Sequence, residues 1–216
     1  MKRKKEDAMT RFPMPALAGI LCLALAAPSA LAAPESASVV AQLRQGGLVL
    51  VMRHASSPSN PPDKQSADRQ NVKLERQLDE KGRATASAMG KAFRAIGIAV
   101  GTVYSSPTYR ARETVRLAGW GTPRLADELG DQGHSMARIQ GAGPADWLRA
   151  KVREAPEPGG NTILVTHMPN IVAAFPALAD GLEDGEAMVF RPAGKGEPKL
   201  VAKIPISEWP TLAKAK

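Results

Sequence analysis

Short apolar runs alternate with longer amphipathic stretches along most of the chain. The apolar runs predict strands over residues 47–53, 100–105 and 161–167. The first run is apolar on both faces, as expected for a central parallel strand that helices cover. Apolar residues at helical spacing predict helices over 80–96 and 144–154. This alternation predicts a three-layer α/β/α fold with a largely parallel central sheet.

The ends of two predicted helices carry capping signals. Asp79 is a good N-cap for the longer of the two helices above, and Gly97 should end it. Ser106 is a good N-cap, and Pro107 a good first residue, for a further helix that runs to about Ala118. Local side-chain chemistry therefore predicts where both helices begin.

The rest of the chain gives weaker signals. A short helix is predicted to start over 39–43 and to end at Gly46-Gly47, and another should begin near Asn170. Residues 188–191 and 199–204 should form a terminal pair of strands joined by a glycine-containing turn. Residues 56–73 are polar and rich in proline, which predicts a long loop of a kind that is often functional.

Polar residues follow each of the three predicted strands. His54 follows the first apolar run, the segment 105–110 follows the second, and His167 closes the third. The carboxyl ends of parallel strands meet at one edge of a sheet, where the functional sites of such sheets lie. Since the chain has only three histidines, two of them at this edge indicate a functional site.

Arginines accompany these histidines. Arg53 precedes His54, and Arg110 falls in the first turn predicted after the second strand. A phosphate monoester is a compact dianion, and guanidinium groups match its oxygens in pairs. An imidazole can attack phosphorus when such donors neutralise the developing charge. The pattern therefore favours a site that binds a phosphoryl group between His54 and His167.

Three sequence motifs resemble those of the histidine phosphatase superfamily, the phosphoglycerate-mutase-like proteins. Arg53-His54-Ala55 is similar to the Arg-His-Gly of that family, with alanine in place of glycine. Residues 105–114 resemble its Ser-Ser-x-x-x-Arg-Ala-x-x-Thr motif, and His167 stands where the family has a late histidine. The likeness extends over about residues 46–204. If the chain is exported, it resembles the exported bacterial branch of this family.

The resemblance implies a role for each motif residue. His54 would be the nucleophile that becomes phosphorylated. Arg53, Arg110 and His167 would bind the phosphoryl group, and Asn60 falls where mutase-like members place an asparagine that contacts phosphate.

The general acid that protonates the leaving oxygen is less well marked. Mutase-like members carry Arg-Leu-x-Glu in mid-chain, and the segment 124–128 offers Asp127 at that spacing with Glu128 one residue later. Both carboxylates stay candidates. Family members that hydrolyse phosphohistidine lack this acid, because a nitrogen leaving group needs less help. The choice of acid therefore bears directly on the substrate.

Other polar residues are expected outside the site. Arg76 and Lys81 could line the mouth of the pocket, but solvated positions are predicted for them, as they are for Arg112 and Arg116. His134 lies in a glycine-rich segment and is expected at the surface.

The start of the chain has the pattern of a secretory signal peptide. Residues 2–5 are positively charged, and residues 16–27 are apolar without charge. Small residues follow at the positions that a signal peptidase reads, with cleavage expected after Ala32 or Ala33. Residues 1–33 are therefore predicted to be a signal peptide, and the mature protein is expected in the periplasm or outside the cell.

A stable membrane anchor is the alternative. The apolar stretch is shorter than the roughly 20 residues that span a bilayer, and Pro28 interrupts it. Cys22, the only cysteine, lies inside this stretch. The mature chain, residues 34–216, is thus expected to be a single domain without disulfides.

These observations predict an exported, metal-independent phosphatase that hydrolyses phosphomonoesters through a phosphohistidine on His54. No cofactor is expected, and the arginines beside the histidines would repel a metal ion. The formal net charge is +8, but the few aromatic residues argue against a nucleic-acid partner. The expected partner is a small phosphorylated substrate, for example a sugar phosphate or an envelope component. A non-catalytic module that binds a phosphorylated ligand and a phosphohistidine phosphatase remain the alternatives.

Overall fold

The computed structural model describes residues 33–58, 72–133, 135–141 and 143–215. These belong to one compact unit, Ala32–Lys216. The strands are β1 Val49–Arg53, β2 Val100–Ser105, β3 Arg124–Leu125, β4 Asn161–Thr166, β5 Ala187–Arg191 and β6 Lys199–Ile204. The helices are α1 Ala33–Gln45, α2 Glu80–Ile96, α3 Tyr109–Ala118, α4 Gly143–Arg153, α5 Met168–Ala174 and α6 Trp209–Lys214, with 3-10 turns η1 Val72–Leu74 and η2 Asp127–Leu129.

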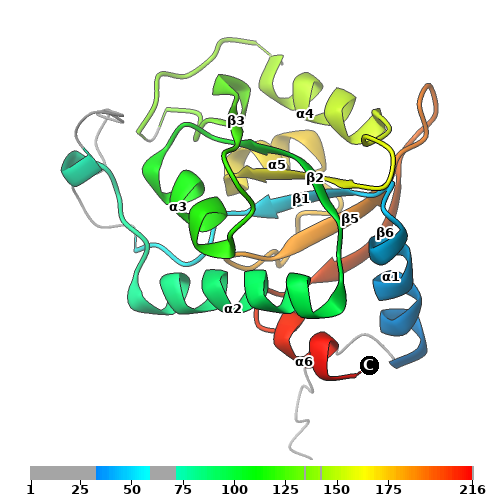
Figure 1. Cartoon of the computed structure of the whole chain (residues 1–216). Helices are drawn as coiled ribbons and strands as arrows, with labels where there is room; N and C mark the ends of the chain where they lie inside the picture. Colours follow the sequence, from blue (N-terminus) through cyan, green and yellow to red (C-terminus); the bar gives the residue numbers. More distant parts are fainter. Residues whose placement is uncertain (1–32, 59–71, 134, 142, 216) are drawn as a thin grey trace, which may run out of the picture. The chain divides into compact units, whose positions relative to one another are not determined.

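The six strands form one sheet in the order β3-β2-β4-β1-β5-β6 (Figure 1). The pairs β1–β4, β2–β4 and β2–β3 are parallel, whereas β5 is antiparallel to β1 and β6 is antiparallel to β5. The sheet is therefore largely parallel, as predicted, and the two antiparallel strands follow last in the chain. The predicted terminal strand pair is confirmed as β5 and β6.

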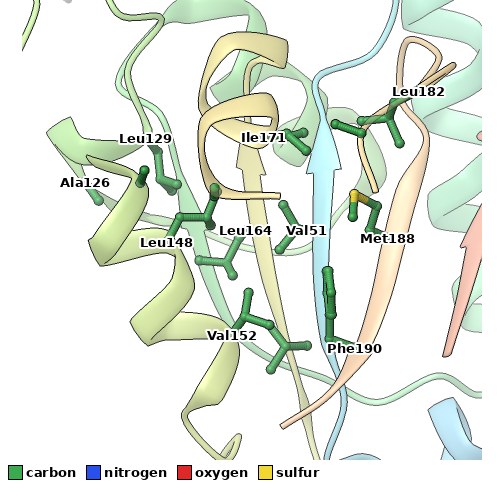
Figure 2. Packing of buried hydrophobic residues seen from close by; sticks show 14 residues of the cluster. Val51, Ala126, Leu129, Leu148, Val152, Leu164, Ile171, Leu182, Met188 and Phe190 are labelled. Atoms are coloured by element: carbon green, nitrogen blue, oxygen red, sulfur yellow. The ribbon is translucent and has the colours of Figure 1, made fainter. Parts of the chain in front are cut away.

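Helices cover both faces of the sheet. On one face α4 and α5 pack against the strands, and Leu148 and Ile171 contribute to a buried cluster with Val51, Leu164 and Phe190 (Figure 2). On the other face α3 packs against β2 and β4, and α2 packs against α3 and α6. The three-layer α/β/α prediction is confirmed. No helix within the described part of the chain has the length and apolar character needed to cross a membrane.

Helix α2 begins and ends where its capping residues predict. The Asp79 side chain accepts a hydrogen bond from the Gly82 amide at 2.6 Å, and Gly97 ends the helix with φ at 83°. Gly90 lets α2 approach α3 closely, since a Cβ atom there would lie 1.9 Å from the Ala118 carbonyl oxygen. Capping residues therefore set the bounds of α2, and the absence of a Cβ atom at Gly90 allows its close contact with α3.

The predicted start of α3 is wrong by two residues. The helix begins at Tyr109 with Thr108 as N-cap, and the Thr108 hydroxyl makes no capping bond to the helix. The Ser106 and Thr108 hydroxyls instead contact His167. The buried carboxylate of Glu75, from a distant segment, accepts the Tyr109 amide hydrogen bond. The Ser106 hydroxyl, which was expected to cap the helix, thus contacts His167 instead.

Two helices extend beyond the predictions. Helix α1 begins at Ala33, well before the predicted residue 39, and α6 was not predicted. In α6 the buried Trp209 packs on Phe93 of α2 with ring centroids 4.5 Å apart. The predicted signal peptide, residues 1–33, lies outside the described residues except for Ala33, and most of the predicted long loop lies outside them as well.

Candidate active site

The ends of β1 and β4 bring the two motif histidines together. These strands are parallel neighbours with Arg53 opposite Thr166, so the next residue of each strand, His54 and His167, lies at the same edge. The His54 amide donates to the Thr166 carbonyl at 3.0 Å. The two imidazole rings are buried, and their centroids are 5.0 Å apart at an interplanar angle of 61°. The predicted convergence is therefore present.

The surroundings of His54 leave one ring nitrogen without a hydrogen, so that its lone pair can act as a nucleophile. Its Nδ1 lies 2.8 Å from the Ala55 carbonyl oxygen, which can only accept, so Nδ1 carries the hydrogen. Its Nε2 lone pair faces Arg110 Nε at 3.3 Å and Arg76 Nη2 at 3.5 Å. Burial first, and the positive charge of Arg110 second, lower the pKa of His54 from 6.5 to about 3. The imidazole is thus neutral at physiological pH.

His167 has the opposite arrangement of its ring nitrogens. Its Nδ1 lies 3.3 Å from Arg110 Nη2, and a guanidinium can only donate, so Nδ1 accepts. Its Nε2 therefore carries the hydrogen and donates to the Ser106 hydroxyl at 2.9 Å and the Thr108 hydroxyl at 3.2 Å. The hydroxyls of Ser106 and Thr108 thus orient the second imidazole.

Arg110 joins the two histidines from the first turn of α3. Its Nε contacts His54 and one terminal nitrogen contacts His167, so the guanidinium lies between the two rings. Its side chain is 1% exposed. It also pairs with Asp131 at 2.7 Å and donates to the Ser135 hydroxyl at 3.3 Å. We call His54, Arg110 and His167 the central cluster.

Asp131 is a buried carboxylate that sequence reasoning missed. It also accepts the Ser135 amide at 2.8 Å, the Met136 amide at 2.9 Å and the Ser135 hydroxyl. Burial raises the pKa of Asp131, but the hydrogen bonds from Ser135, Arg110 and Met136 outweigh burial, and the pKa lies below its ordinary value. Asp131 is therefore an anion that faces Arg110.

Arg76 was predicted at a solvated position, and that prediction is wrong. It is half-buried, donates from Nε to the Ser57 hydroxyl at 3.1 Å and lies beside His54 Nε2. A hydrogen bond from the Asp79 amide to the Ser56 carbonyl, 3.1 Å long, closes the loop that carries Arg76 back to the site. No periodicity encodes such a closure, so the sequence pattern held no signal for it.

Arg53 lies at the border of the cluster. It forms an ion pair with Asp184 at 2.8 Å, in which the two side chains are 27% and 33% exposed. Its charge still contributes to the lowered pKa of His54, although it is the smallest of the causes. Arg53 is thus within electrostatic range of the nucleophile.

The candidate acids lie in the turn η2. Asp127 is exposed and Glu128 is half-buried, and the backbone carbonyls of both accept hydrogen bonds, from the Gly130 amide and from the Asn170 side chain. Asn60 lies outside the described residues. The roles of these three residues stay predictions.

The donor set suits an anion. Two guanidiniums and two hydroxyls surround two neutral imidazoles, and such groups bind tetrahedral oxyanions. Among the described residues, no three histidine, cysteine, aspartate or glutamate side chains gather in a way that could bind a metal ion. The arrangement can therefore orient a phosphoryl group against a nucleophilic nitrogen.

Comparison with known proteins identifies the family. No curated protein is similar enough in sequence to count as a match. The fold is similar to that of the protein histidine phosphatase SixA complexed with tungstate (TM-score 0.56, 15% identity, covering 74% of this chain and 98% of that one). It is also similar to a phosphoserine phosphatase mutant from Entamoeba histolytica in complex with phosphoserine (TM-score 0.50, 13% identity, covering 74% and 97%). A family model of the histidine phosphatase superfamily (branch 1) matches residues 49–164, and the chain belongs to that superfamily.

Proposed function

We propose that this protein is an exported phosphatase that hydrolyses phosphate monoesters through a phosphohistidine on His54, without a metal ion. The observation that carries this proposal is the state of His54. Its Nδ1 hydrogen is committed to the Ala55 carbonyl, and its Nε2 lone pair faces two guanidiniums. A neutral imidazole beside fixed cations is the arrangement needed to attack a phosphoryl dianion.

The reaction proceeds in two displacements. Arg110, Arg76 and Arg53 bind the phosphoryl oxygens, and the His54 Nε2 lone pair attacks phosphorus. The bond from phosphorus to the leaving oxygen breaks, and that oxygen takes a proton from a general acid. Water then attacks phosphorus, the phosphorus–nitrogen bond breaks, and its electron pair returns to Nε2. Inorganic phosphate leaves, and the proton of the attacking water passes to the conjugate base of that acid or to solvent.

We propose Asp127 or Glu128 as the general acid, and both lie in the turn η2, a few residues before Asp131. An aryl leaving group is stable as an anion and hardly needs the acid, whereas an alkyl leaving group depends on it. Asp127→Asn and Glu128→Gln, each assayed on an alkyl and an aryl phosphate, identify the acid. The variant that loses alkyl turnover while keeping aryl turnover marks the residue.

Hydrolysis of phosphohistidine is the second candidate function. It is favoured by Asp131, the carboxylate in contact with Arg110, which is held ionised and has no proton to give. A nitrogen leaving group needs less protonation by the enzyme than an alkoxide. A phosphohistidine peptide turned over far faster than any phosphomonoester would make this the principal activity.

Export and substrate class follow from the sequence pattern alone. The positive start, apolar stretch and small residues before residue 34 support secretion into the periplasm or medium. An exported phosphatase meets phosphorylated sugars and envelope components, and we propose these as its substrates. Fractionation of cells that express the tagged full chain tests export; a tag found only in the cytosol at full length contradicts it.

The decisive experiment traps the intermediate. The purified protein, with chelator and without added metal, is assayed on a panel of phosphomonoesters and quenched for an acid-labile, alkali-stable phosphoenzyme. His54→Ala should abolish both turnover and the phosphoenzyme, whereas His134→Ala, a histidine outside the three motifs, should change neither. Anion binding without phosphate release at any pH would identify a binding module instead.

A further inference from the structure

We propose that Asp131 is a positioning residue that fixes the Arg110 guanidinium between the His54 and His167 imidazoles for phosphoryl transfer. This inference rests on the function proposed above and adds to it a residue outside the family motifs. Asp131 touches neither imidazole in the contacts described above. It acts through Arg110, with which it forms the 2.7 Å ion pair.

The contacts of Arg110 show why it needs a fixed partner. Its side chain reaches both imidazoles at 3.3 Å, and its Nη2 is shared between His167 and Asp131. Both imidazole contacts are long and lead to neutral acceptors, whereas the bond to Asp131 is short and charge-assisted. The carboxylate is therefore the strongest of these three restraints on the orientation of the guanidinium.

Asp131 is itself anchored. One carboxylate oxygen accepts the Ser135 amide and hydroxyl as well as Arg110, and the other accepts the Met136 amide. The Ser135 hydroxyl also accepts from Arg110 Nη1 at 3.3 Å, so the same short loop holds the guanidinium at two points. Hydrogen bonds thus connect Asp131, Ser135 and Met136 through Arg110 to His54.

Two other roles for Asp131 fit the contacts less well. A general acid must carry a proton, but this carboxylate accepts from four donors and is ionised. A residue that only closes its own loop would need the Ser135 and Met136 bonds alone. The ion pair to Arg110, whose two side chains are 1% and 2% exposed, joins that loop to the central cluster and calls for a further role.

Asp131→Asn tests the proposal by removing the charge while keeping the shape. The guanidinium stays in the site as a cation but loses its alignment to the transferring oxygens, so the loss should lie mainly in kcat. We expect kcat to fall by about 10²-fold, the effect of a misplacement near 1 Å. The factor should be equal for aryl and alkyl phosphates, whereas an acid would lose more on the alkyl substrate.

A double-mutant cycle with Arg110→Gln separates positioning from a general loss of structure. If Asp131 acts through Arg110, then Asp131→Asn should have almost no effect on kcat/KM in the Arg110→Gln background. Losses that multiply in the double variant would overturn the proposal. Asp146→Asn provides the matched control, because Asp146 pairs with Arg149 on the surface, and this variant should keep full activity.

Binding of orthovanadate, which adopts the trigonal-bipyramidal geometry of phosphoryl transfer, gives a second readout of the same cycle. If the wild-type protein shows neither turnover nor a phosphoenzyme, the proposed function is refuted. The double-mutant cycle measured by vanadate affinity then still tests whether Asp131 acts through Arg110. If Asp131→Asn does not fold, Ser135→Ala takes its place in the cycle, because it removes one donor to Asp131 and one acceptor for Arg110. A Ser135→Ala protein with unchanged kcat and vanadate affinity would sink the proposal.

Discussion

Two arginines serve the same site in different ways, and each is paired with a carboxylate. The Arg110–Asp131 pair has side chains that are 1% and 2% exposed, whereas those of the Arg53–Asp184 pair are 27% and 33% exposed. The nitrogen–oxygen distances are nearly equal, at 2.7 and 2.8 Å. The two pairs therefore differ in their exposure to solvent, and of the two contacts only Arg110–Asp131 is also a hydrogen bond.

The difference assigns separate tasks to the two guanidiniums. An ion pair that is partly exposed to solvent, such as Arg53–Asp184, contributes only about 0–1 kcal/mol and yields readily to a competing anion. A buried pair adds little net stability, but removal of one partner costs about 3–5 kcal/mol because a charge is left uncompensated. We therefore propose that Arg110 is a fixed element of the site and that Arg53 exchanges Asp184 for a phosphoryl oxygen when substrate binds.

The largest expected effect comes from breaking the buried pair. Asp131→Ala should lower the free energy of unfolding by about 3–5 kcal/mol, measured by urea denaturation. The double variant Arg110→Met/Asp131→Leu should regain most of that stability without regaining activity, because no charge is then left buried. Asp146→Ala breaks an exposed pair and should cost at most about 1 kcal/mol. Equal losses in the Asp131 and Asp146 variants would contradict the comparison.

Arg76 should give an intermediate effect, because it contacts His54 as Arg110 does but is partly exposed as Arg53 is. It is half-buried and shares the His54 Nε2 lone pair with Arg110. A hydrogen bond to a charged group is worth about 1.5–3 kcal/mol, so Arg76→Ala should lower kcat/KM by roughly 10- to 100-fold. Steady-state kinetics on an aryl phosphate measure this loss. Lys81→Ala is the control from the same segment, and a similar loss there would argue against a specific role for Arg76.

The central cluster was predictable because strand ends are local features. The apolar runs before His54 and His167 indicate where β1 and β4 end, and the parallel sheet then requires their last residues to meet. Helix α2 was predictable for the same reason, since Asp79 and Gly97 act on their own helix. A local pattern predicted the structure where no distant residue competed for its groups, and it failed at Ser106, whose hydroxyl contacts His167 and caps no helix.

The residues around the cluster were not predictable from such patterns. Asp131 reaches Arg110 through a turn in which Gln132 and Gly133 both have positive φ, of 57° and 100°. This turn brings Ser135 back onto the Asp131 carboxylate. Sequence spacing favoured Asp127 and Glu128 instead, because the family pattern concerns the acid and says nothing of what anchors the arginine.

The unequal influence of the two arginines on His54 can be measured by NMR titration. Arg110 is the second-largest cause of the lowered pKa of His54, after burial, and Arg53 is the smallest. Arg110→Gln should therefore raise the pKa of His54 above about 3 by more than Arg53→Gln does, and both should leave it below 6.5 because burial remains. A larger rise in the Arg53 variant would reverse the assignment of tasks.

The lowered pKa of His54 also affects the free energy of unfolding at acidic pH. Between pH 6.5 and about 3 the unfolded chain binds a proton that the buried His54 does not, so this residue makes stability fall as the pH falls through that window. His54→Gln should flatten that part of the profile of unfolding free energy against pH. A profile unchanged by His54→Gln would show that the folded and unfolded chains bind that proton equally.

The smallest expected effect comes from the exposed pair. Asp184→Asn removes the carboxylate that competes for Arg53, so KM for a phosphomonoester should fall while kcat stays nearly constant. Because an exposed pair is worth at most about 1 kcal/mol, the change should not exceed roughly fivefold, and the free energy of unfolding should change by less than about 0.5 kcal/mol. Added salt screens exposed charges, so the difference in KM from wild type should shrink as ionic strength rises. The loss of kcat in Asp131→Asn should be nearly insensitive to the same salt series, because that ion pair is buried. If both variants depended on salt in the same way, burial would not separate the two arginines.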